Sequence, residues 1–154
     1  MNFQKILNGC LVLFLVMNVS ACGSDGVKGN GKTTELSLKE AEKFETGFLY
    51  VRSPFESRKE EEDFKIKEIE RVAKAKNIDL IIYHAKEDTS KLGLKQNTLT
   101  FAFYQDGEVK KKLDFIDLSE DNIHFEVATF VQSVQNVVQS ESMFLLIVFR
   151  NRSG

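Results

Sequence analysis

The residues best suited to nucleophilic, redox or metal chemistry are few in this chain. Among its 154 residues there are two cysteines, Cys10 and Cys22, and two histidines, His84 and His124. No cysteine follows Cys22, so the chain beyond it has no thiol for an internal disulfide, a thiolate metal site or a cysteine nucleophile. Neither histidine has a second histidine or a cysteine at metal-ligand spacing. We therefore expect both at the surface or at a helix cap, with no metal bound.

Other charged or hydroxyl groups in suggestive patterns have simpler explanations. The acidic run 60–63 is typical of the solvated face of a helix, and Ser53 of a helix start rather than a nucleophile. Residues 110–112 are lysines that alternate along a strand, so Lys111 points away from its neighbours. The glycine-rich segment 23–35 lacks the spacing of a phosphate-binding loop. We predict no catalytic residue, no metal site and no cofactor site, and hence a protein that is not an enzyme.

The bulk composition is that of one globular domain. Hydrophobic residues make up 42% of the chain and charged residues 29%, and 13 phenylalanines can fill a core without tryptophan. A chain of this length allows a single domain. The net charge of −2 supplies no strong positive field, so we expect no nucleic acid partner.

Residues 1–21 have the three parts of an export signal. Lys5 supplies a positive charge, an apolar stretch too short for a comfortable membrane span follows, and small residues precede Cys22. The tetrapeptide Val19-Ser20-Ala21-Cys22 resembles the lipobox of bacterial lipoproteins. The resemblance implies cleavage before Cys22, a diacylglycerol thioether on its sulfur, and acylation, as by palmitate, of the new amino terminus. A cleaved signal with Cys22 left free and an uncleaved N-terminal helix are the alternatives.

The lipobox resemblance predicts an extracytoplasmic protein that is lipid-anchored to a bacterial membrane, either the cell membrane or an outer membrane. Two or three acyl chains give stable anchoring where one chain would be marginal. Residues 22–35 contain the lipidated cysteine and a glycine-rich stretch with one large apolar residue, Val27. That composition predicts a flexible linker between the membrane and the folded domain.

Two apolar strands joined by a helix should form the centre of the domain. Residues 47–53 and 78–85 are nearly continuous apolar runs, as in strands that are buried on both faces. Between them, Ser53 is expected to cap a helix that starts at Pro54, ends near Asn77 and carries an apolar stripe. A strand-helix-strand crossover of this kind makes the two strands parallel neighbours.

Two more helices should flank these strands. A capping box at Ser37 and Glu40 predicts a short helix before the first strand. Helix caps at 119–122 and apolar residues that recur with helical spacing over 127–138 predict an amphipathic helix packed on the core. The apolar extension 140–154 is too short to span a membrane. It forms either a buried extra strand, which we favour, or a patch for a partner.

A β-hairpin is predicted around the dipeptide Asp106-Gly107. Aromatic residues alternate up to this dipeptide, which is typical of a type I′ turn, and a second strand follows it. The register that this turn sets places Tyr104 beside Val109 and Thr100 beside Leu113. Because a hairpin adds an antiparallel pair to the two parallel strands, we predict an α/β protein with a mixed sheet and flanking helices.

This order of elements resembles the thioredoxin fold over residues 36–139. The strand at 47–53 running into a helix is similar to the segment that carries the family's Cys-x-x-Cys motif. Gly93-Leu94 followed by the hairpin resembles the family's Gly-Ile, cis-Pro-Thr and Asn-Gly segment. The resemblance implies an α+β sandwich with a thioredoxin-like mixed sheet. The family's functional residues are missing, because neither end of 55–58 is a cysteine and no proline stands near Thr98.

These observations predict a binding or accessory module. We expect a cell-envelope lipoprotein whose redox-inactive thioredoxin-like domain contacts a protein or peptide, while the lipid on Cys22 engages the membrane. One alternative is a protein related to thiol-disulfide oxidoreductases that acts with the cysteines of a partner. The other is a structural lipoprotein of the cell envelope with an unrelated α+β fold.

Overall fold

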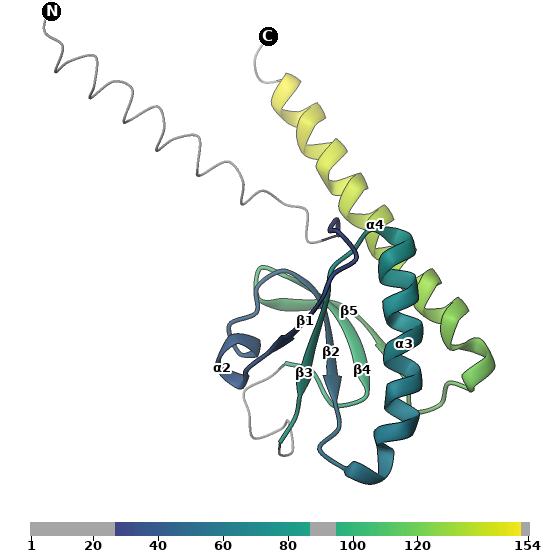
Figure 1. The fold of residues 1–154 in the computed structure, drawn as a ribbon. Helices are drawn as coiled ribbons and strands as arrows, with labels where there is room; N and C mark the ends of the chain where they lie inside the picture. The colour runs from purple at the N-terminus through teal and green to yellow at the C-terminus, as the bar shows by residue number, and fades with distance from the viewer. Residues whose placement is uncertain (1–26, 87–94, 152–154) are drawn as a thin grey trace, which may run out of the picture.

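The computed structural model describes residues 27–86 and 95–151 and has one mixed sheet with flanking helices (Figure 1). The five strands lie in the order β1-β3-β2-β4-β5. They are β1 Thr33–Leu36, β2 Gly47–Arg52, β3 Leu80–His84, β4 Thr100–Gln105 and β5 Glu108–Asp114. Strand β3 is parallel to β1 and β2, and β4 is antiparallel to both β2 and β5. The predicted α/β class is confirmed. The predicted signal segment, Cys22 and Gly93-Leu94 lie outside the described residues.

Helices cover both faces of the sheet (Figure 1). They are α2 Leu38–Ala41, α3 Lys59–Lys76 and α4 Glu120–Asn151, and a 3-10 turn η1 Glu56–Arg58 precedes α3. Helices α3 and α4 pack on one face and the short α2 on the other. The capping box predicted for α2 is present, with the Glu40 carboxylate accepting hydrogen bonds from the Ser37 backbone N–H and hydroxyl.

Strand β2 is buried on both faces, as its continuous apolar run predicts. Phe48 and Tyr50 lie in the core beneath α3 and α4, whereas Leu49 and Val51 lie in the core beneath α2. All four side chains are completely buried. Phe48 also packs within 6.3 Å, centroid to centroid, of three other rings, those of Phe101, Phe103 and Phe130. The centre of the sheet therefore forms a rigid platform for the segments at its edges.

Helix α3 begins later than predicted, although it ends where expected. Pro54 lies outside the helix, and regular α-helix starts only at Lys59. The predicted cap at Ser53 is wrong because this residue bonds elsewhere: its N–H donates to Glu62 Oε1 at 2.8 Å, and its hydroxyl accepts from the Phe55 N–H at 3.2 Å. At the other end, Asn77 adopts a left-handed conformation with φ of 52° and closes the helix.

The hairpin turn is confirmed, but the predicted register is only half right. Asp106 and Gly107 both have positive φ, 56° and 71°, as a type I′ turn requires. Tyr104 pairs with Val109 as predicted, whereas Thr100 pairs with Asp114. A register shift between Phe103 and Tyr104 causes the difference, because a β-bulge places one extra residue on β5.

The same bulge changes the arrangement of the lysines on β5. Phe103 pairs with Lys111 and Tyr104 with Val109, so Lys110 is the extra residue. Lys110 and Lys111 both line a surface hollow beside α4. The predicted alternation is therefore wrong for this pair, because Lys110 and Lys111 lie on the same side of the strand.

Residues 27–35 belong to the folded domain. Val27 is 2% exposed and lies in the core with α3 and α4. The backbone N–H groups of Asn30 and Lys32 donate to the Asp79 carboxylate at 2.8 and 3.0 Å, and β1 then pairs with β3. The flexible linker predicted for this stretch is wrong, because backbone pairing and one buried valine fix a polar segment to the sheet edge.

Helix α4 continues through the segment for which the sequence predicts an extra strand. It is a single helix of 32 residues, and residues 139–149 contain no glycine or proline to end it. Its core-facing residues up to Val138 are buried, apart from Val137. Beyond Val138 the helix leaves the sheet (Figure 1), so the predicted strand in 140–154 is wrong. In the described part of the chain, no helix is long and apolar enough to cross a membrane.

Candidate functional site

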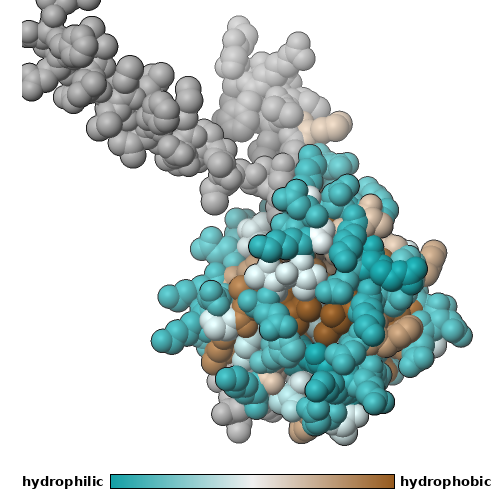
Figure 2. All heavy atoms as spheres, viewed as in Figure 1, coloured by the Kyte–Doolittle hydropathy of each residue, from teal (hydrophilic) through white to brown (hydrophobic). Residues whose placement is uncertain are grey.

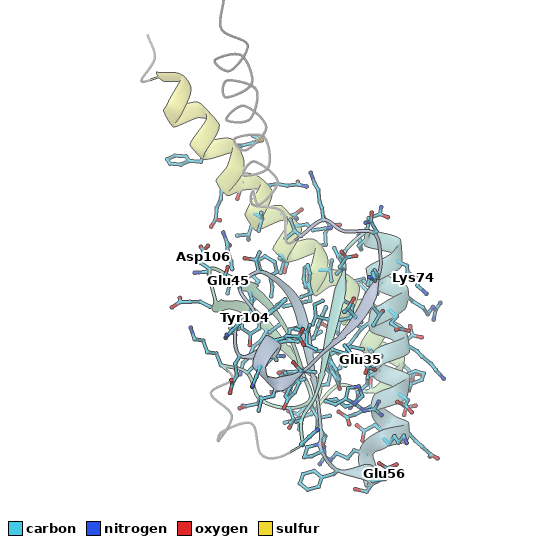
Figure 3. All side chains as sticks on the ribbon, turned by 60° about the vertical axis from the view of Figure 1, so that its left-hand side comes forward. Glu35, Glu45, Glu56, Lys74, Tyr104 and Asp106 are labelled. Atoms are coloured by element: carbon cyan, nitrogen blue, oxygen red, sulfur yellow. The ribbon has the colours of Figure 1, made fainter. Side chains whose placement is uncertain are left out.

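A groove of about 300 Å³ lies at the carboxyl ends of β2 and β3. Its lining residues are Arg52, Ser53, Pro54, Phe55, Glu56, Lys59, His84 and Ala85. Strands β2 and β3 are parallel neighbours, so their carboxyl ends meet at the same edge of the sheet. The carboxyl edge of parallel strands is where α/β proteins commonly bind ligands. In Figure 3, Glu56 marks the groove end of α3 and Lys74 its far end.

A buried carboxylate supports the floor of this groove. Glu62, in the first turn of α3, is 0% exposed. Its Oε1 accepts the Ser53 backbone N–H at 2.8 Å and the Tyr50 hydroxyl at 3.3 Å. Its Oε2 lies 3.8 Å from Arg52 Nε and has no hydrogen-bond partner among the described residues. The sequence prediction of a solvated acidic face over 60–63 is wrong for this residue.

Arg52 connects the end of β2 to the start of α3. Its Nη2 donates to the Lys59 carbonyl at 3.2 Å and to Asp63 Oδ1 at 2.6 Å. The Arg52 side chain is largely buried, whereas the Asp63 carboxylate is nearly half exposed, so solvent partly screens this pair. Glu62 binds the start of the loop between β2 and α3 through the Ser53 N–H. Arg52 binds the end of the same loop through Lys59 and Asp63.

Burial sets the protonation behaviour of this cluster. It raises the pKa of the Glu62 carboxyl above its ordinary value, although the Ser53 N–H and the Arg52 guanidinium oppose that rise. Burial, followed by the neighbouring Glu62 charge, also raises the pKa of the Tyr50 hydroxyl. Tyr50 therefore keeps its proton and donates a hydrogen bond to Glu62. The cluster holds a loop in place and presents no carboxylate to the groove.

The loop held in this way presents an aromatic ring to solvent. Phe55 is 66% exposed at the rim of the groove. Proline at position 54 restricts the local backbone, and the bond from the Phe55 N–H to the Ser53 hydroxyl closes the turn. Lys59 pairs with Glu56 at 3.1 Å on the same rim. The groove thus presents one exposed aromatic ring beside polar and charged groups.

A second buried charge lies further along α3. Lys65 is 2% exposed, and its Nζ pairs with the Glu61 carboxylate and lies 3.5 Å from the Phe115 carbonyl oxygen. Sequence reasoning missed both buried charges. A signal existed for Glu62, because it stands four residues before Ile66 and so continues the apolar stripe of the helix.

The predicted surface histidines are both exposed. His84 lies at the groove with Nε2 3.3 Å from Glu35 Oε1, and His124 Nδ1 lies 2.9 Å from Glu68 Oε2 on α3. Each histidine therefore has its own carboxylate partner, and the two do not share a site. Among the described residues, no group of three potential metal ligands forms a cluster.

The segment before β4 has an unusual backbone. Leu99 has a φ of 59°, a conformation that costs a non-glycine residue roughly 1–2 kcal/mol. Its N–H donates to the Val51 carbonyl at 2.8 Å, and its own carbonyl accepts the Phe115 N–H at 3.1 Å. These two bonds hold Leu99 beside the end of β2, close to the loop between β2 and α3 that lines the groove.

Comparisons with known proteins add no relative to this description. No protein-family model matches the chain, and searches of curated proteins and of solved structures give no match. What is established is an α/β protein with a mixed five-stranded sheet and a groove at the carboxyl edge of its parallel strands.

Proposed function

We propose that this protein is an extracytoplasmic lipoprotein, anchored through Cys22, whose thioredoxin-like domain binds a protein or peptide partner without redox chemistry. The strand order and the α3 crossover between β2 and β3 support the likeness to thioredoxin. Residues 55–58, which stand where that family carries its redox motif, lie in the loop and turn beside the groove and contain no cysteine. On this proposal, the domain retains the sheet of the thioredoxin fold and lacks the cysteines of its redox motif.

The exposed Phe55 at the groove carries the proposal. A large apolar side chain held on a fixed loop loses little conformational freedom on binding, and aromatic residues in such positions contribute much of the energy of an interface. Full burial of the ring against a partner would contribute roughly 2 kcal/mol. The polar rim around it supplies the hydrogen-bonding groups that an extended peptide needs.

The position of the groove also suits an anchored receptor. It lies at the start of α3, whereas Val27, the first described residue, packs near the end of that helix, where Gln135 Nε2 donates to both the Val27 and Lys76 carbonyls. The 18 residues of α3 separate the two ends by about 27 Å. A chain tethered through Cys22 would therefore hold the groove away from the bilayer.

Site-specific photo-cross-linking in intact cells tests the binding role. A photoreactive phenylalanine analogue at position 55 should give one discrete protein adduct, because the ring meets the partner there. The matched control is position 125, an equally exposed phenylalanine on α4 (68%, against 66% for Phe55). Adducts at both positions, or at neither, would contradict binding at the groove.

Two further measurements separate this proposal from its alternatives. The mass of the mature N-terminal peptide should include diacylglycerol on Cys22, and an unmodified mass would overturn the anchor. Insulin reduction by the purified protein should stay at the background rate, because the folded domain has no thiol to exchange. Clear turnover would favour the oxidoreductase alternative.

A further inference from the structure

The last part of α4 projects beyond the folded domain. Its residues from Val138 to Asn151 extend roughly 20 Å past the end of the core, and this part of the helix stands clear of the sheet in Figures 1 and 3. Met143 and Phe144 are 64% and 67% exposed. Residues 143–149 are all apolar. Two exposed apolar side chains at the start of such a run favour contact with another apolar surface.

The projecting end of α4 lies at the same end of the domain as the proposed anchor. Helix α4 passes Val27 at Gln135, whose Nε2 lies 3.2 Å from the Val27 carbonyl oxygen. Only residues 23–26 separate Val27 from Cys22, so the lipidated sulfur can stand at most about 18 Å away along the chain. Because residues 27–35 are packed into the domain, the tether is short. A bilayer that held Cys22 would lie within reach of the end of α4.

We infer that residues 143–149 insert into the surface of the lipid bilayer beside the anchor and act as a second membrane contact. This inference rests on the proposed lipidation of Cys22. The occupant is a bilayer with anionic lipid, because residues 142–154 include Arg150 and Arg152 after the apolar run and contain no acidic residue. Basic residues of this kind are attracted to anionic headgroups.

The order of residues favours shallow insertion of the helix end over deep insertion along the helix axis. Polar residues flank the apolar run on both sides, with 139–142 before it and 150–153 after it. Seven helical residues span only about 10 Å, a third of the roughly 30 Å hydrocarbon core. If the helix end enters the surface obliquely, the flank before the run stays among the headgroups and the apolar run sinks to the acyl boundary. Arginine side chains after the run reach back to the headgroups along their apolar stems.

Fluorescence quenching in reconstituted vesicles tests this contact on the full, lipidated protein. Phe144→Cys introduces a thiol for a bimane label, and Phe125→Cys is the matched control on the same helix, 68% exposed but outside the projecting end. The vesicles contain phosphatidylethanolamine and phosphatidylglycerol, with and without acyl-brominated lipid. We expect at least twofold quenching at position 144 and little change at position 125.

Equal quenching at the two positions would overturn the inference. Disulfide cross-linking of two copies of the Phe144→Cys variant, without quenching, would also overturn it, because a second chain would then cover the helix. Rejection of this membrane contact can be distinguished from failure of the proposed function. In a chain in which Cys10 and Cys22 are both replaced by serine, the anchor is absent and no native thiol takes the label, so the comparison between positions 144 and 125 stays readable. A lipidated chain without quenching would keep the anchor and reject the contact.

Discussion

The two ends of the domain are built on different physical principles. The groove end is held by directional bonds, in which Glu62 and Arg52 fix the loop that carries Phe55. At the opposite end, Val27 packs in the core with α3 and α4, and α4 extends beyond the core with Met143 and Phe144 exposed. Hydrophilic residues cover most of the face seen in Figure 2, and hydrophobic residues show near its middle and in smaller patches toward its edges.

Under the proposed function, this difference suits a domain that meets a partner at one end and a membrane at the other. A loop that must present the same surface to a partner gains from hydrogen bonds, because their geometry fixes its shape. An end that lies against lipid gains from apolar area, which needs no particular geometry. Substitutions at the two ends should therefore differ in their effect on the free energy of unfolding, and we expect the largest loss at the groove end.

Replacing the buried carboxylate should give the largest loss of stability. Glu62→Ala leaves the Ser53 N–H and the Arg52 guanidinium without this partner in a buried site, so we expect the free energy of unfolding to fall by about 3 kcal/mol. Urea denaturation monitored by circular dichroism measures it. The control Glu60→Ala, on the exposed side of α3, should change it by less than about 0.5 kcal/mol. Equal losses would mean that the cluster does not organise the groove end.

Adding a methyl group at the packed end should lower the free energy of unfolding by less than Glu62→Ala does. The loss should still exceed that of the same change at an open turn. Gly31 and Gly107 have the same φ of 71°, but a Cβ at Gly31 would lie 2.9 Å from Lys74 Cα, whereas one at Gly107 meets nothing within 4 Å. Gly31→Ala should therefore lower the free energy of unfolding by about 2 kcal/mol and Gly107→Ala by about 1 kcal/mol. If Gly31→Ala costs nothing in thermal denaturation, residues 27–35 are a linker after all.

Removing the second buried charge should change stability little. Lys65→Met keeps the side-chain volume and leaves the half-exposed Glu61 carboxylate free to be solvated. Because an apolar replacement of a buried charge is often neutral or stabilising, we expect a change within about 1 kcal/mol. Lys67→Met on the exposed side of α3 is the control. A loss as large as that from Glu62→Ala would place Lys65 in the structural cluster as well.

The smallest effect should appear as a pH dependence. Because burial raises the pKa of Glu62, the folded state holds this proton to higher pH than the unfolded chain does. The stability that this provides is full below the unfolded pKa, about 4.3, and is lost as pH rises through the raised folded value. Relative to Glu62→Gln, which does not titrate, the wild-type protein should lose stability over that interval in denaturation series. An opposite slope would mean that Arg52 and Ser53 outweigh burial.

Sequence patterns predicted the elements whose signals are local. The apolar runs indicated β2 and β3, Asp106-Gly107 indicated the hairpin turn, and α3 ended at Asn77 as expected. The patterns failed where contacts distant in sequence decide the structure. Strand β1 is a polar edge strand that depends on its pairing with β3. Thr100 pairs with Asp114 and not with Leu113, because a bulge shifts the register.

The candidate site was less predictable than the fold. An acidic run at the start of a helix normally faces solvent, and only the position of Glu62 on the apolar stripe distinguishes it from Glu60 and Glu61. The projecting end of α4 was ambiguous for another reason. A short apolar run fits a buried strand as well as a helix, and here continuity with the preceding helix decided the outcome.

Energy transfer from each end of the domain to the membrane tests the central claim most directly. Phe55→Cys and Phe144→Cys of the lipidated protein carry the same donor dye, and the vesicles carry an acceptor on their headgroups. Since α3 alone separates the ends by about 27 Å, we predict strong transfer from position 144 and weak transfer from position 55. Equal transfer from both positions, or stronger transfer from position 55, would contradict a domain that meets the membrane at one end and its partner at the other.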